Sequence, residues 1–124
     1  MKIIVYDDTL DFGGHQIMAC HGIEALASDP ANEILCMIHS ENRQLAEKLA
    51  KIKSCQILEA PGSTRRFQSV LNHVDHRGIK RLQHRFGTLQ ADLLLCIQGD
   101  IEHSSQALIA AHRMGLKGIS YIAL

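Results

Sequence analysis

Short, nearly continuous apolar runs recur along this chain and restrict its fold more than any other feature. The three clearest cover residues 3–6, 33–39 and 92–98. A strand that is apolar on both faces is typical of a parallel sheet covered by helices on both sides. Residues 55–58 and 118–122 predict two shorter strands. The sequence therefore predicts five strands, most of them buried.

Helical patterns separate these runs. Ser40 is expected to cap the second helix, because a serine side chain accepts a hydrogen bond from the first turn. The pattern of the third and longest helix is interrupted near Gly78, and Gly115 is expected as the glycine that ends the last helix. The spacing of apolar residues predicts helices over residues 16–26, 41–52, 65–86 and 104–114.

Strands that alternate with helices predict an α/β fold. Because crossovers between parallel strands are right-handed, we expect a Rossmann-like three-layer sandwich with a five-stranded parallel sheet in the order 3-2-1-4-5. The whole of residues 1–124 is expected to form one domain. In such sheets ligands bind at the carboxyl ends of strands, near the switch between strands 1 and 4. Those ends carry Asp7, Asp8, Gln98, Gly99 and Asp100.

Gly13 and Gly14 lie between the first strand and the first helix. Two adjacent glycines let the backbone turn sharply and approach a ligand closely. A helix that begins there points free N–H groups and its positive dipole end at the same place, which favours a phosphate. The alternative is a plain tight turn, because the full G-x-G-x-x-G motif is absent. His15 either donates to such a ligand or is an ordinary loop histidine.

Composition limits the classes of partner. The formal net charge is zero, so bulk charge favours neither nucleic acid nor membrane. The 4% of aromatic residues is too few for a nucleic-acid stacking surface, and nucleic acid is not expected as a partner. The eight histidines are scattered without a ligand pattern, so no metal site is predicted.

The cysteines favour a reducing compartment. Three of the four lie within apolar runs, where a free thiol behaves as a small buried side chain. No run approaches the ~20 apolar residues of a membrane span, and the chain begins with a strand instead of a signal peptide. A cytoplasmic protein with reduced thiols is therefore expected. The cysteines are Cys20, Cys36, Cys55 and Cys96.

Three segments together resemble a known family. They are IIVY followed by DFGGHQ, then ADLLLCIQGDIE, and finally AAHRMGLKGISYIAL. This combination is similar to the N-terminal half of GT-B glycosyltransferases, particularly glycosyltransferase family four, and the likeness covers nearly the whole chain. Enzymes of that family have two Rossmann-like domains: the N-terminal one mainly holds the acceptor and the C-terminal one the nucleotide-sugar donor.

The resemblance implies roles for particular residues. The donor diphosphate would be contacted by Gly13 and Gly14. The acceptor cleft would be bordered by His15, Gln16, Gln98, Gly99 and Asp100. An anionic acceptor or a lipid would be held by Arg65 and Arg66. No cofactor is implied beyond the nucleotide-sugar substrate. Gln16 departs from the family, which commonly has glutamate there. The donor domain and its E-x(7)-E pattern are missing, so the chain is expected to be an acceptor half that is inactive alone, with an apolar surface favouring self-association.

Alternatives remain at this stage. The basic segment of residues 65–85 predicts either peripheral contact with the inner face of a membrane or an ordinary solvated helix face. Asp7, Asp8 and Asp100 also fit a stand-alone flavodoxin-like domain for anion binding or signalling, although a receiver domain would need an aspartate after strand 3, where Leu58-Glu59 stands. An NAD-binding domain is less favoured, because His39 occupies the usual position of the acidic ribose ligand.

Overall fold

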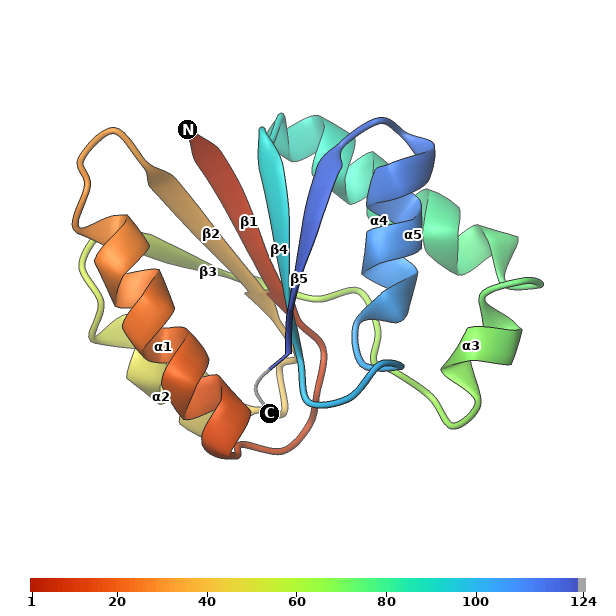
Figure 1. Cartoon of the computed structure of the whole chain (residues 1–124), viewed down its shortest axis with the longest axis horizontal. Coiled ribbons are helices and arrows are strands. Elements are labelled where there is room, and N and C mark those ends of the chain that lie inside the picture. The colour runs from red at the N-terminus through yellow and green to blue at the C-terminus, as the bar shows by residue number, and fades with distance from the viewer. Residues whose placement is uncertain (123–124) are drawn as a thin grey trace.

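The computed structural model describes residues 1–122 and consists of a single open sheet between two layers of helices (Figure 1). The strands are β1 (Lys2–Asp7), β2 (Glu33–Ile38), β3 (Cys55–Glu59), β4 (Leu93–Gln98) and β5 (Lys117–Ile122). The helices are α1 (Gly14–Ala27), α2 (Arg43–Ala50), α3 (Gln68–Leu71), α4 (His76–Leu89) and α5 (Ser105–Arg113).

All strands of the sheet are parallel, and their order is β3-β2-β1-β4-β5. β1 is central and pairs with β2 through Ile3 and Ile34 and with β4 through Ile3 and Leu93. The predicted Rossmann-like fold and strand order are therefore confirmed. The switch in strand order falls between β1 and β4, as expected for the binding edge of such a sheet.

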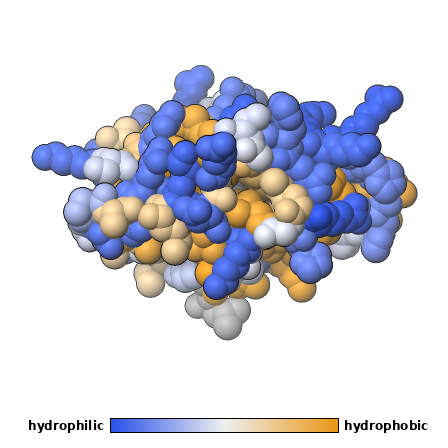
Figure 2. Space-filling view, turned by 90° about the horizontal axis from the view of Figure 1, so that it is seen from above, coloured by the Kyte–Doolittle hydropathy of each residue, from blue (hydrophilic) through white to orange (hydrophobic). Residues whose placement is uncertain are grey.

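Each face of the sheet has its own core. α1 and α2 cover one face, where Ile3 and Val5 of β1 are buried, and α4 and α5 cover the other, where Ile4 and Tyr6 are buried (Figure 1). Tyr6 meets Phe86 of α4 edge to face, with ring centroids 6.2 Å apart. Hydrophilic side chains surround apolar atoms in the view from above (Figure 2). Alternation along β1 thus decides which layer each side chain enters.

The predicted cap of the second helix was wrong. Asn42, not Ser40, caps α2, and its side chain accepts a hydrogen bond from the N–H of Leu45. The predicted interruption of the long basic segment near Gly78 is a boundary between two helices, at residues 72–75. Asp75 is the reason, because its carboxylate accepts from the N–H of Gly78 and starts a new helix there.

Gly115 fulfils its predicted role after α5. Its φ is +77°, in the left-handed region that glycine tolerates best. The N–H of the following residue, Leu116, then bonds back to the carbonyl of Ala111, which closes the helix end. After this turn the chain continues directly into β5.

The layer of α1 and α2 leaves part of the sheet uncovered on the side of β5. Met18, Leu95 and Tyr121 line a small apolar depression of about 130 Å³ there, and Ile119 of the edge strand is 43% exposed. Self-association through this surface stays a prediction. In the part of the chain that the structure describes, none of the helices combines the length and apolarity needed to cross a bilayer.

Candidate functional site

The loops that follow β1, β3 and β4 meet at the carboxyl edge of the sheet (Figure 1). β1 ends in two buried carboxylates that the strand alternation sends to opposite faces. Asp7 lies on the side of α1 and accepts from Thr9, with a side-chain bond of 2.6 Å, whereas Asp8 lies on the side of α4 and α5 and accepts from Thr64. The two aspartates therefore belong to two different halves of the edge, and do not form one acidic cluster.

Gln16 organises the loop between β1 and α1. Its side-chain oxygen accepts from the N–H of Gly13, 2.5 Å away, and its amide group donates to Thr9 Oγ1 and to the carbonyl of Asp11 at 2.7 and 2.9 Å. The residue is fully buried. We predicted that Gln16 borders the cleft, but the structure uses all of these polar atoms inside the loop, as a capping residue does.

Gly14 is the first residue of α1 and is exposed. The N–H groups of Gln16 and Ile17 bond to the carbonyl of Gly13. Within residues 1–122, the N–H groups of Gly14 and His15 are left as the unpartnered donors of this first turn. They combine with the positive end of the helix dipole, which favours an anion.

Neither glycine of this loop is required by the fold. Gly13 has φ −143° and ψ −170°, an extended conformation that any residue adopts. A Cβ on Gly14 would meet no atom within 4 Å, and one on Gly13 would make only ordinary contacts, the nearest at 3.6 Å. The small size of Gly14 therefore leaves room on the outer side of the helix start.

Two histidines stand beside this helix start. His15 comes from α1 and His103 from the loop between β4 and α5, and both pack on Gly99. A Cβ on Gly99 would lie 2.9 Å from His15 Cε1 and 3.0 Å from His103 Nδ1, so glycine is needed there for close approach. Nε2 of His15 and Nδ1 of His103 are buried without a hydrogen-bond partner among the described residues. These are nitrogen atoms that a bound ligand could satisfy.

Asp100 borders the same group of residues. Its carboxylate lies 3.5 Å from His103 Nε2. Partial burial works against ionisation, but hydrogen bonds from the N–H groups of His103 and Glu102 hold the pKa of Asp100 below its ordinary value. The carboxylate is thus ionised at neutral pH and places a negative charge beside the ring of His103.

The side chain of Gln98 is engaged within the protein. It is buried, donates to the carbonyl of His103 at 2.5 Å, and accepts from the hydroxyl of Ser120. It therefore braces the loop that carries His103. Of the predicted cleft residues, the structure brings His15, Gly99 and Asp100 together and places Gln98 and Gln16 behind them as supports.

A polar cavity of about 270 Å³ occupies the other half of the edge, on the side of α4 and α5. The loop of residues 61–65 forms one wall and the start of α4 forms another. Arg65 and Arg81 supply positive charge, and Asp8 and Asp75 supply carboxylates. The remaining lining comes from Tyr6, Pro61, Gly62, Ser63, Gly78, Leu82 and Gln106.

A network of hydrogen bonds holds the rim of this cavity. Asp75 accepts from Arg65 Nη2 at 2.8 Å and from Gln106 Nε2 at 2.9 Å. The bond from Gln106 and the N–H of Gly78 are the main reasons that the pKa of Asp75 lies below its ordinary value. Arg81 donates to the carbonyl of Pro61. The cavity thus presents fixed charges of both signs, which suits a small polar ligand with several hydroxyl or anionic groups.

Asp8 lies at the floor of the cavity and is 4% exposed. Burial raises the pKa of its carboxyl above the ordinary value, although hydrogen bonds from Thr64 and Ser104 oppose this. A raised pKa in the folded state means that stability falls as the pH rises between the unfolded and folded pKa values of Asp8. The ionised carboxylate of Asp8 therefore lowers the stability of the folded protein at neutral pH.

Asp8→Asn should consequently stabilise the protein at pH 7 by roughly 1 kcal/mol, because the amide oxygen keeps both acceptor roles without a buried charge. The gain should disappear as the pH falls below the folded-state pKa of Asp8, because the wild-type carboxyl is then protonated and carries no charge. Urea unfolding at several pH values measures this. A gain that is equal at all pH values would contradict the assignment of the cost to the charge.

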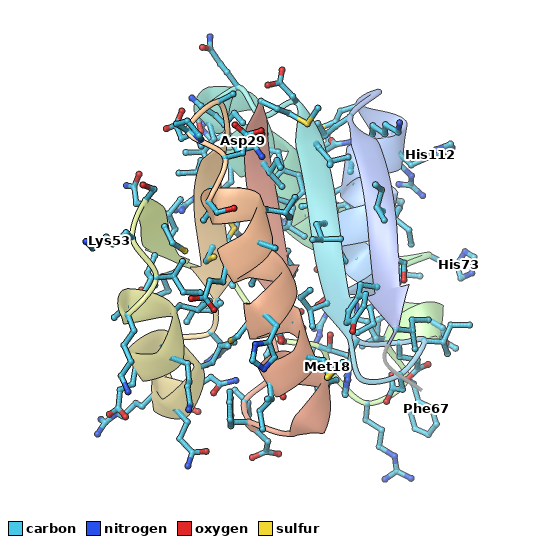
Figure 3. The ribbon with its side chains drawn as sticks, turned by 60° about the vertical axis from the view of Figure 1, so that its left-hand side comes forward. Met18, Asp29, Lys53, Phe67, His73 and His112 are labelled. Carbon is cyan, nitrogen blue, oxygen red and sulfur yellow. The ribbon has the colours of Figure 1, made fainter. Side chains whose placement is uncertain are left out.

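The structure separates the two arginines that were predicted to act together. Arg65 is tied to Asp75 at the cavity, whereas Arg66 stacks on the ring of Phe67, 4.9 Å from its centroid. Phe67 projects from the molecule next to α3 (Figure 3). The name apolar tip refers below to four exposed side chains, given with their exposed fractions: Phe67 (61%), Val70 (64%), Val74 (68%) and Ile101 (80%).

Sequence reasoning missed three residues of the site. His103 could have been found, because it follows Gly99 in the loop after a predicted strand. Thr64 and Gln106 gave no such signal, since their roles depend on packing between the loop after β3 and α5. Sequence patterns locate the edge of the sheet, but they do not report which loops approach one another across it.

The chain matches no protein-family model and no curated protein. The fold and the site define a class instead: a Rossmann-like α/β domain with an open helix start and a separate polar cavity at the carboxyl edge of its sheet.

Proposed function

We propose that this chain is the acceptor-side domain of a retaining glycosyltransferase, which transfers a sugar from a nucleotide-sugar donor to a glycan, lipid or small-molecule acceptor. In this proposal the N–H groups of Gly14 and His15 contact the donor diphosphate, and a second domain holds the nucleotide. The cavity beside Asp8 receives the acceptor.

One observation carries the proposal. Gly14 begins a helix at the strand switch, its two nearest N–H donors are unpartnered within residues 1–122, and nothing lies within 4 Å of where its Cβ would be. A glycine in an exposed helix start lowers helix stability relative to alanine. Its presence where neither backbone nor packing needs it supports close approach by a ligand from outside.

The neighbouring groups suit phosphate and hydroxyl chemistry. His15 and His103 hold unpartnered ring nitrogens next to the helix start among the described residues, and the carboxylate of Asp100 lies 3.5 Å from Nε2 of His103. Such donors stabilise the negative charge that develops on a departing diphosphate. The cavity supplies carboxylate and guanidinium groups at a volume of about 270 Å³, which suits an acceptor of monosaccharide size.

The test of this function is the activity of the complete natural gene product. The coding sequence downstream of Leu124 should be determined, and the product should be assayed for hydrolysis and transfer with a panel of nucleotide sugars. We expect a second Rossmann-like half and consumption of one donor. A natural chain that ends at Leu124 and consumes no donor would overturn the enzyme proposal.

The same free N–H groups favour a second candidate, a stand-alone flavodoxin-like domain that binds an anion or a nucleotide without transfer chemistry. Everything needed to bind a phosphate at the start of α1 lies within this chain. Binding of a nucleotide in the absence of any transfer by the complete gene product would select this candidate.

We also propose that the apolar tip contacts the surface of an anionic membrane. Phe67, Val70 and Val74 follow a helical spacing across α3 and the turn after it. Ser69 of α3 donates to Glu102, which is the chain neighbour of Ile101. Arg66, which stacks on Phe67, and Arg77, in the first turn of α4, are exposed. Exposed apolar side chains flanked by cations favour an interfacial position.

Phe67→Asp should lower the affinity for phosphatidylglycerol vesicles roughly five-fold, because part of the burial of an aromatic side chain is lost. Phe67 has φ +60°, a conformation that aspartate tolerates better than most residues, so folding should be preserved. Vesicle sedimentation measures the binding. Met18→Asp, at an exposed apolar position of α1, is the matched control; equal losses in both variants would contradict a specific role for the tip.

A further inference from the structure

Cys36 and Cys55 form a thiol pair that the proposed function does not use. Their sulfur atoms are 2.9 Å apart and share a hydrogen bond. Cys36 is fully buried in the middle of β2, and Cys55 is the half-buried first residue of the edge strand β3. We propose that this pair is an oxidation site, at which a small disulfide such as oxidised glutathione converts the two thiols into an intramolecular disulfide.

The strand register places the two thiols on the same face of the sheet. Cys36 stands opposite Ile57, and Cys55 stands opposite Ile34, so the cysteines are diagonal neighbours on adjacent strands. Both belong to the core beneath α1 and α2. The sulfur atoms must approach by less than 1 Å to reach the bonded distance of about 2.05 Å. Adjacent, hydrogen-bonded strands already hold them in place.

The two thiols are not equivalent. The hydrogen bond between the two thiols lowers the pKa of the Cys55 thiol against the opposing effect of burial. The same bond, together with burial, raises the pKa of Cys36. Cys55 is also the more accessible of the two, at the edge of the sheet. It is therefore the thiol that attacks first, because the thiolate is the nucleophile.

The exchange proceeds in two balanced steps. The Cys55 thiolate attacks one sulfur of oxidised glutathione, which breaks the S–S bond and releases one glutathione thiolate. Cys36 then gives up its proton, which the released thiolate can accept, and its sulfur attacks Cys55. The Cys55–glutathione bond breaks, and a second glutathione leaves. Two protein thiols are oxidised and one glutathione disulfide is reduced to two thiols.

The other two cysteines provide internal controls. Cys20 lies in the same core but on α1 and is half-buried, and Cys96 lies in the opposite core, where its thiol faces the carbonyl of Ser104 at 3.9 Å. Among residues 1–122, neither lies within hydrogen-bonding distance of another thiol. Oxidation under mild conditions should therefore select Cys36 and Cys55.

The experiment treats the reduced, folded protein with oxidised and reduced glutathione at graded ratios, quenches with acid and alkylates the remaining thiols. Cleavage after glutamate separates Cys20 from Cys36, because Glu24 and Glu33 lie between them. We expect the loss of two hydrogens from the intact mass, a single Cys36–Cys55 link, and alkylated Cys20 and Cys96. The link should raise the Tm by roughly 5–10 °C by closing the β2–α2–β3 segment.

Matched variants test the order of attack. Cys36→Ala should stop at a mixed disulfide between Cys55 and glutathione, Cys55→Ser should form no link, and Cys20→Ser should behave as the wild type. Four alkylatable thiols after oxidation of the wild type would overturn the proposal, as would a link that contains Cys20. The wild-type map decides the matter even if Cys36→Ala fails to fold.

Discussion

Gly14→Val should weaken the binding of inorganic pyrophosphate at least ~10-fold. A loss of this size is expected when one hydrogen bond to a charged group is lost. Pyrophosphate stands for the diphosphate of the proposed donor. A valine side chain at the start of α1 would occupy the open space through which the ligand reaches the N–H groups of Gly14 and His15. The fold should be unaffected, since the added atoms meet no neighbour within 4 Å at Cβ. Isothermal titration calorimetry measures the affinity.

Gly22→Val is the matched control for this prediction. Gly22 lies in the same helix, is exposed, and has nothing within 4 Å of its Cβ position, but it is far from the helix start. This variant should bind pyrophosphate like the wild type. Unchanged affinity in Gly14→Val, or an equal loss in both variants, would remove the glycine loop from the mechanism.

Gly78→Ala should destabilise the protein by about 2 kcal/mol, the upper range for loss of a helix cap. Its Cβ would lie 2.4 Å from Asp75 Oδ2 and 2.7 Å from Gln106 Nε2. Asp75 cannot move without giving up its cap on α4 and its ion pair with Arg65. The substitution should therefore also disturb the wall of the polar cavity. Thermal unfolding measures the loss, which we expect as a fall in Tm of roughly 5–10 °C.

Gly22→Ala should have the opposite effect. It should stabilise the protein by about 0.5–1 kcal/mol, because alanine favours a helix and the position is open. The contrast between two helical glycines separates the packing requirement at Gly78 from helix propensity. A stabilising Gly78→Ala would contradict the contact between Asp75 and Gln106 as the structure presents it.

The fold could be predicted from the sequence because its strands are local and strongly patterned. The apolar runs that became β1, β2 and β4 are buried as expected, and the rule for right-handed crossovers then leaves few strand orders. Helix boundaries were less predictable. Asn42 and Asp75 cap their helices although nearby residues are also suitable caps. Which residue caps a helix depends on contacts such as that of Asn42 with the carbonyl of Thr9.

The site could be predicted only in part. The alternation of side chains along β1, continued one residue past the end of the strand, separates Asp7 from Asp8. The closeness of His15 and His103 depends on the small size of Gly99, and the sequence alone gives no distance between their loops. The thiol pair of Cys36 and Cys55 likewise required the register of β2 and β3, which becomes known only once the sheet is built.

The central claim is that the start of α1 is a phosphate site, and the most direct measurement is a map of amide chemical shifts. The ¹⁵N-labelled protein should be titrated with pyrophosphate. We predict the largest changes at the N–H groups of Gly14 and His15, with smaller ones at Gly99 and His103. Resonances of Gly14 and His15 that do not move, or that move equally in Gly14→Val, would contradict the claim.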